Sequence, residues 1–226
     1  MPKLLLLRHL KSQWNLDDRY AGWTDGPLAK GQDRLAEDLA KQVFSYKIDK
    51  VYSSALFRNM VTVSDIFKFN PERYPLFIHL DDNPLKSKGN FTDVDGNDMP
   101  VYVTNALNER YYGKLQGLNK QETIKKFGEE KVRLWRRSYK VAPPGGESLR
   151  DVCKRTDAFY KKYPAKDLKK GFNVLIVASH NTLRAIVKNI EKISNEDIAK
   201  VELPFAGLLQ YDFDEKMRLL SNKYFI

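Results

Sequence analysis

An arginine and a histidine stand side by side at the end of the first apolar run of this 226-residue chain. Residues 4–7 are four leucines, Arg8 and His9 follow, and Ser12 and Asn15 come next. A guanidinium pairs with phosphate oxygens, an imidazole can donate, accept or attack, and hydroxyl and amide groups add hydrogen bonds. The stretch is therefore a candidate phosphoryl site. The alternative is an ordinary strand end whose polar residues face water.

The four leucines predict a short strand that is buried on both faces. Arg8 and His9 then lie at the carboxyl end of this strand, where open α/β sheets bind their ligands. Two further apolar runs, residues 50–54 and 172–178, also end in hydroxyl-bearing residues.

The remaining pattern predicts helices that alternate with these strands. We expect helices over residues 32–45, 55–69, 121–139 with a break at Gly128, 147–163 and 183–193, and a last strand over 208–213. This alternation predicts an α/β fold, a three-layer α/β/α sandwich with a mostly parallel central sheet. The length suits a single domain over residues 1–226.

Residues from about 70 to 100 interrupt the alternation. They are rich in Pro, Gly, Asn and Asp and show little period of either kind. A run of this length without periodicity predicts a surface insertion, which could act as a lid or a partner site.

The formal net charge of +10 predicts a field that attracts anions. Lys and Arg are spread along the chain and form no continuous block, which favours a small phosphorylated ligand over nucleic acid. The first apolar run is too short for a membrane span or a signal peptide, so no membrane partner is expected. The single cysteine, Cys153, leaves no internal disulfide, which suits a reducing cytoplasm.

Four motifs farther along the chain are specific when they are taken together. They read Leu-Asn-Glu-Arg at 107–110, Leu-Gln-Gly-Leu-Asn-Lys at 115–120, Phe-Gly-Glu-Glu at 127–130 and Trp-Arg-Arg-Ser-Tyr at 135–139. With Arg8-His9, Gly22-Trp23-Thr24-Asp25 and Asn181, they resemble the cofactor-dependent phosphoglycerate mutases of the histidine phosphatase superfamily. The resemblance covers nearly the whole chain except residues 70–100. It implies a phosphoglycerate mutase-like fold and the exchange of 3- and 2-phosphoglycerate through a phosphohistidine.

The resemblance also implies roles for individual residues. His9 is the expected nucleophile, and Arg8 and Arg58 are expected to hold the phosphoryl oxygens. Glu109 is the expected general acid and base, which calls for a raised pKa. The expected substrate-binding residues are Ser12, Asn15, Gly22, Tyr112, Lys120, Arg136, Arg137 and Asn181. 2,3-Bisphosphoglycerate is the expected primer, no metal is expected, and the family resemblance suggests a homodimer or a tetramer.

The sequence departs from the family pattern at the two most important segments. The family has glycine after the nucleophile, where this chain has Leu10, whose side chain could crowd the site. A direct alignment puts Ser179 where the second catalytic histidine belongs and His180 where the family has glycine. A one-residue slip returns His180 to the catalytic position, and the two alignments exclude each other.

Two departures lie near the C-terminus. Residues 203–207 read Leu-Pro-Phe-Ala-Gly, where the family has Ile-Pro-Thr-Gly with a hydroxyl near the site. The chain ends at Ile226, where the family mutases usually continue into a tail that closes the pocket. An open pocket admits water to a phosphohistidine, which favours hydrolysis.

Three functions follow from these observations. The first is a phosphoglycerate mutase, either fully working or slowed by the departures. The second is a catalytically weak or inactive relative that binds a phosphorylated ligand or a protein partner. The third is a histidine phosphatase that uses the same phosphohistidine.

Overall fold

The computed structural model describes residues 1–81 and 95–225 and has a seven-stranded sheet at its centre. The strands are β1 (Lys3–Arg8), β2 (Lys50–Ser54), β3 (Tyr74–His79), β4 (Asp98–Thr104), β5 (Val174–Ala178), β6 (Leu208–Phe213) and β7 (Leu219–Phe225). They lie in the order β3-β4-β2-β5-β1-β6-β7. The first five are mutually parallel, and β6 pairs antiparallel with both β1 and β7. The predicted mostly parallel sheet is confirmed.

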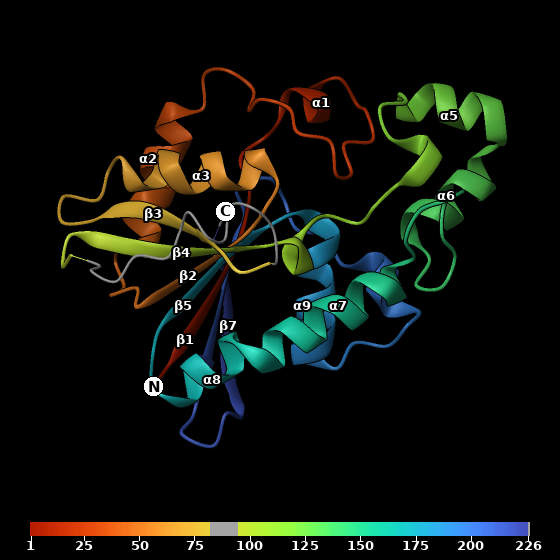
Figure 1. Cartoon of the computed structure of the whole chain (residues 1–226). Coiled ribbons are helices and arrows are strands. Elements are labelled where there is room, and N and C mark those ends of the chain that lie inside the picture. The colour runs from red at the N-terminus through yellow and green to blue at the C-terminus, as the bar shows by residue number, and fades with distance from the viewer. Residues whose placement is uncertain (82–94, 226) are drawn as a thin grey trace.

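Helices cover both faces of this sheet (Figure 1). The described α-helices are α1 (Gln13–Leu16), α2 (Asp33–Val43), α3 (Phe57–Phe67), α5 (Lys120–Phe127), α6 (Glu129–Arg137), α7 (Leu149–Lys162), α8 (Pro164–Lys169) and α9 (His180–Glu191). Three short 3-10 helices are η1 (Asn105–Leu107), η2 (Gly113–Leu115) and η3 (Asp197–Lys200). Figure 1 shows α2 and α3 on one side of the sheet, α7, α8 and α9 on the other, and α5 and α6 at one end. None of the helices described in residues 1–81 and 95–225 is long and apolar enough to cross a membrane.

The leucines of β1 divide the apolar core between the two faces. Leu5 and Leu7 pack in a cluster with Leu39 of α2 and Ile66 of α3. Leu4 and Leu6 belong to the opposite cluster, with Phe159 of α7 and residues of α9. Successive side chains of a strand point to opposite faces, so a continuous apolar run is what a central strand between two helical layers needs.

Most predicted elements are found, and the break at Gly128 separates α5 from α6. Gly128 has φ +85°, a left-handed conformation that favours glycine and ends α5.

The expectation of an insertion without regular structure over residues 70–100 is wrong for its two ends. Residues 74–79 form edge strand β3, and residues 98–104 form β4 between β3 and β2. Pro75 and Pro100 obscured these strands in the sequence, but both fall near strand starts, where a missing N–H matters little. The middle of the expected insertion lies outside the described residues.

The last strand was also missed. The sequence analysis ended the sheet at residues 208–213, whereas β7 adds a further strand beyond β6. Most residues of β7 are exposed, so it lacks the apolar alternation that marks a half-buried strand.

Candidate active site

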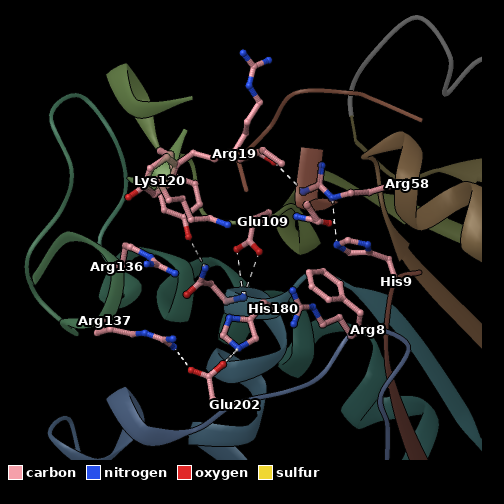
Figure 2. A pocket seen from close by; sticks show the side chains of 17 residues that line it. Arg8, His9, Arg19, Arg58, Glu109, Lys120, Arg136, Arg137, His180 and Glu202 are labelled. Atoms are coloured by element: carbon pink, nitrogen blue, oxygen red, sulfur yellow. Dashed lines mark hydrogen bonds and ion pairs between the residues drawn. The ribbon is translucent and has the colours of Figure 1, made fainter. Parts of the chain in front are cut away.

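A pocket of about 250 Å³ lies where β1, β2, β4 and β5 end. This is the edge at which Arg8 and His9 were expected, at the carboxyl end of the first strand. The pocket is lined by 17 residues, which are Arg8, His9, Asn15, Arg19, Tyr20, Ala21, Gly22, Arg58, Glu109, Tyr112, Lys120, Arg136, Arg137, His180, Asn181, Glu202 and Phe205 (Figure 2). Six of them are Arg or Lys, and two are carboxylates. The lining therefore suits a small polyanion.

His9 is buried at the carboxyl end of β1 with both ring nitrogens engaged. Its Nδ1 lies 2.5 Å from the carbonyl oxygen of Leu10. A carbonyl oxygen only accepts, so Nδ1 carries the proton and donates it there. Nε2 then holds a lone pair, and it accepts a hydrogen bond from Nε of Arg58 at 3.3 Å. This tautomer leaves Nε2 as the nucleophilic atom.

The charge state of His9 also suits a nucleophile. Burial lowers the pKa of His9 well below its ordinary 6.5, and the positive charges of Arg58 and Arg8 lower it further. The imidazole is therefore neutral at physiological pH.

Arg58 is fixed in the first turn of α3 by several acceptors. Its Nη1 donates to the carbonyl of Thr24 at 3.1 Å, and its Nη2 donates to the carbonyl of Gly22 at 2.8 Å. Gly22 is favoured here because its φ is +49°, and a Cβ would also lie 2.1 Å from Oε1 of Gln116, so that side chain would have to move. The guanidinium thus faces His9 without freedom to rotate.

Arg8 is held from the opposite side by the segment that leads into β6. Its Nη1 donates to the carbonyl of Leu203 at 2.5 Å, and its Cζ lies 3.5 Å from the centre of the Phe205 ring. Burial lowers the pKa of Arg8 to about 10, which leaves it charged at neutral pH. Arg8 and Arg58 are therefore cations on the same side of the pocket as His9, as predicted.

Glu109 is a buried carboxylate on the loop after η1. The indole Nε1 of Trp23 donates to its main-chain carbonyl at 2.5 Å, and Nη2 of Arg155 donates to the same oxygen at 3.0 Å. Its side-chain Oε1 accepts from the backbone N–H of Arg110 at 2.6 Å and of Asn181 at 3.2 Å. The backbone of α9 thus aims the carboxylate into the pocket.

The expectation of a raised pKa for Glu109 is wrong. Burial by itself raises the pKa of this carboxyl, but the Arg110 N–H, His180, Arg58 and Asn181 together hold it below the ordinary 4.5. Glu109 is therefore ionised at neutral pH and is poised to accept a proton.

Four further predicted binding residues lie on the far side of the pocket, namely Tyr112 on the loop before η2, Lys120 on α5, and Arg136 and Arg137 on α6. The hydroxyl of Tyr112 accepts from Nδ2 of Asn181 at 3.1 Å. Nζ of Lys120 donates to Asp18 at 2.6 Å. Figure 2 shows Arg136 and Arg137 pointing inward from the same side. These cations face the His9 side across the pocket, so they can hold a second anionic group.

The side chain of Leu10 points away from the pocket and does not crowd the site. Its side chain is 1% exposed and packs in the core with Leu5 and Leu7, and it does not line the pocket. Its φ is not positive, so glycine is not needed for the backbone conformation. The N–H of Leu10 donates to Oγ1 of Thr62 at 3.0 Å, which turns the side chain toward the core.

The structure places Ser179 and His180 in different surroundings. Ser179 is the N-cap of α9 and is 1% exposed, and its Oγ accepts from Nη2 of Arg58 at 3.3 Å and from Nδ2 of Asn59 at 3.2 Å. His180 begins α9 and lines the pocket. Of the two candidates, His180 is the one that lines the pocket, while Ser179 lies outside the lining and accepts a hydrogen bond from Arg58.

Ser12 is the other predicted residue that lies outside the pocket lining. It is the N-cap of α1, and its Oγ donates to Oδ1 of Asn15 at 2.8 Å. It orients Asn15, which does line the pocket.

Five residues of the lining were missed by the sequence analysis, namely Arg19, Tyr20, Ala21, Glu202 and Phe205. Residues 19–21 directly precede Gly22, which was a predicted substrate-binding residue. Their place next to Gly22 in the sequence could have indicated that they also line the pocket. Phe205 lies within the segment 203–207, which departs from the family pattern, and Glu202 directly precedes that segment. Nothing in the local pattern indicated that Glu202 reaches the pocket.

Comparison with known proteins assigns the family. The sequence model of the histidine phosphatase superfamily (branch 1) matches residues 4–76 and 93–223. The chain belongs to the histidine phosphatase superfamily. It is 41% identical to a 2,3-bisphosphoglycerate-dependent phosphoglycerate mutase of Methanococcus vannielii, over 96% of this chain and 92% of the relative. It is 40% identical to the protein of the same name from Chlamydia caviae, over 93% of each chain.

Solved structures in this superfamily share the fold of the chain. Bacillus stearothermophilus YhfR superposes with a TM-score of 0.76 at 18% identity, covering 97% of this chain and 95% of that one. A mycobacterial glucosyl-3-phosphoglycerate phosphatase gives a TM-score of 0.73 at 20% identity, covering 94% and 93%. At these identities the likeness concerns the fold alone, and it confirms the predicted phosphoglycerate mutase-like α/β architecture.

Proposed function

We propose that this protein is a 2,3-bisphosphoglycerate-dependent phosphoglycerate mutase. The observation that carries the proposal is the buried, neutral imidazole of His9, whose Nε2 lone pair faces Arg58 inside a pocket rich in cations. Relatives of that name, 36–41% identical over nearly the whole chain, support this choice of substrate.

The chemistry is a transfer of phosphoryl between His9 and a glycerate hydroxyl. The N–P bond at Nε2 breaks as an O–P bond forms, and the proton of the attacking hydroxyl passes to Glu109. Arg8 and Arg58 neutralise the charge on the phosphoryl oxygens during the transfer. An ionised Glu109 suits this half of the reaction.

The same carboxyl must later return its proton when the second half-reaction restores phosphohistidine. Once protonated, it donates to the departing glycerate oxygen as the new N–P bond forms. The negative charge of a phosphoryl group beside Glu109 raises its pKa and so helps it to hold the proton meanwhile. The two roles thus need no permanent shift of the Glu109 pKa.

The pocket fits the proposed primer. When bound, 2,3-bisphosphoglycerate supplies the phosphoryl group that His9 carries. One phosphate would be held by Arg8 and Arg58, and the other phosphate and the carboxylate by Lys120, Arg136 and Arg137. In the described part of the chain, no three His, Cys, Asp or Glu side chains gather as a metal ion requires.

A two-readout assay tests the proposal. With 2,3-bisphosphoglycerate present, we expect 3-phosphoglycerate to become 2-phosphoglycerate faster than inorganic phosphate is released. Release of phosphate without isomerisation would make the protein a phosphatase, and binding without either reaction would make it an inactive relative. Both of those results contradict the proposal.

We place the reaction in the cytoplasm as part of this proposal. Cys153, the chain's single cysteine, is a buried free thiol, which suits a reducing compartment.

A further inference from the structure

One carboxylate of the pocket has no part in the proposed reaction. Oε1 of Glu202 contacts Nη1 of Arg137, and its Oε2 lies 3.1 Å from Nε2 of His180. Figure 2 shows Glu202 between these two side chains. Arg137 is one of the cations that would hold the far end of the substrate. The Glu202 carboxylate is therefore paired with Arg137, a cation that the substrate would need for its own binding.

The charge on Glu202 is permanent at physiological pH. Its hydrogen bond with His180 and its pairing with Arg137 lower the pKa of Glu202 to about 2. Its charge also acts on the buried guanidinium of Arg8. An anionic group that binds Arg137 thus meets a fixed negative charge already paired with that cation.

The backbone around Glu202 is anchored, but its side chain is not enclosed. The next residue, Leu203, accepts from Arg8, and the N–H of Ala206 donates to the carbonyl of His9 at 3.3 Å. The Glu202 side chain itself is 57% exposed. A ligand can therefore displace the carboxylate by rotating its side chain into water, without moving the segment.

We propose that Glu202 is an internal competitor for the second anionic group of the substrate and so sets how strongly the pocket prefers ligands with two anionic ends. The proposal rests on the proposed function, because it takes a phosphorylated carboxylic acid as the ligand. A ligand whose far end is anionic must replace Glu202 on Arg137. Inorganic phosphate held by Arg8 and Arg58 need not do so.

Direct binding of two ligands tests this idea. Calorimetry on the full chain compares 3-phosphoglycerate with inorganic phosphate in wild type and in Glu202→Gln, which keeps the shape and removes the charge. We expect the dissociation constant for 3-phosphoglycerate to fall about three- to tenfold, which corresponds to about 0.65–1.4 kcal/mol. The constant for inorganic phosphate should change by less than about twofold because that ligand does not compete with Glu202.

Matched controls separate competition from a general charge effect. Glu196→Gln removes the same charge from an exposed residue at the start of η3 that does not line the pocket, and it should leave both constants unchanged. In an Arg137→Gln background, Glu202→Gln should bring little further gain, because the contested cation is gone. A thermal melt checks that each variant is folded.

Several results would overturn the proposal. They are unchanged or weaker binding of 3-phosphoglycerate by Glu202→Gln, an equal gain in Glu196→Gln, an equal gain for both ligands, and no binding of 3-phosphoglycerate by any variant. None of these readouts requires phosphoryl transfer. A protein that binds as expected but does not isomerise its ligand would therefore fail the proposed function and still satisfy this inference.

Discussion

The surroundings of His9, and not the ordinary pKa of an imidazole, keep its side chain neutral. Burial together with Arg58 and Arg8 lowers its pKa, and the Leu10 carbonyl fixes the proton on Nδ1. The same guanidiniums that disfavour an imidazolium would stabilise a phosphoryl group bound to the ring. In the proposed reaction, Arg8 and Arg58 would therefore both keep the His9 imidazole neutral and stabilise the phosphoryl group that it carries.

Replacement of Arg58 by Gln should raise the pKa of His9. The imidazolium form then no longer faces the adjacent positive charge, so protonation at Nε2 becomes easier. An NMR titration of the imidazole signals, assigned with a His9→Gln variant, measures the shift. Arg133→Gln, which removes a guanidinium paired with Glu130 on the surface of α6, should leave the His9 titration in place. An unshifted His9 signal in Arg58→Gln would contradict the role given to this arginine.

Replacement of Glu109 by Gln should lower kcat by about 10²–10⁴-fold, because the amide cannot carry the proton. KM for 3-phosphoglycerate should change much less, since the carboxylate faces the reacting hydroxyl rather than the anionic groups. Steady-state kinetics of the isomerisation separates the two parameters. Glu129→Gln, in the first turn of α6, serves as the control. A variant of Glu109 with near-wild-type kcat would exclude it as the proton carrier.

At the scale of elements, the site depends on how β1 and α9 meet. His9 N–H donates to the Ala178 carbonyl at 3.3 Å at the end of β5, and the N–H of Asn181 in the first turn of α9 reaches Glu109. The strand ends bring nucleophile and carboxylate together across residues that are distant in the sequence. This arrangement follows from parallel strands that share one carboxyl edge.

Replacement of Leu10 by Gly should destabilise the fold without raising activity. The side chain is buried among Leu5, Leu7 and the α2–α3 layer, so its removal leaves a cavity. We expect a loss of about 2–5 kcal/mol in the free energy of unfolding, measured by urea denaturation. Leu220→Gly, on exposed β7, should cost far less. A faster enzyme after Leu10→Gly would show that Leu10 does obstruct the site.

The sequence predicts these elements better than it predicts their side-chain contacts. Apolar runs indicate β1 and β5, and the helical pattern over residues 183–193 indicates most of α9, because both signals are local. The orientation of Leu10 depends on a hydrogen bond between its N–H and Thr62. The position of the Glu202 side chain depends on its ion pair with Arg137 at the end of α6. Such contacts join residues far apart in the chain, so no spacing rule reveals them. The exposed strand β7 was missed for a related reason. It forms by pairing with β6, and its own sequence lacks the apolar alternation of a half-buried strand.

At the scale of the whole molecule, the net charge of +10 accompanies a pocket with six cations and two carboxylates. The long-range field should concentrate anionic substrates near the pocket, and salt should screen it. We expect KM for 3-phosphoglycerate to rise about three- to tenfold between about 50 and 500 mM NaCl, with little change in kcat. A KM that is insensitive to salt would show that the field contributes nothing to binding.

The homodimer or tetramer implied by the family resemblance stays a prediction. Sedimentation velocity on the full chain would establish the state of assembly. A monomer at all concentrations would contradict it.

The central claim is that His9 carries the phosphoryl group, and its phosphorylation is the most direct test. The protein is incubated with ³²P-labelled 2,3-bisphosphoglycerate, quenched, and divided between acid and alkaline conditions before digestion and mass spectrometry. We predict an acid-labile, alkali-stable phosphate on His9 that is lost in His9→Asn and kept in His79→Asn, whose side chain lies on β3 outside the pocket. The account is contradicted if His9 stays unlabelled, or if the label is found on another residue, while the protein still binds 2,3-bisphosphoglycerate.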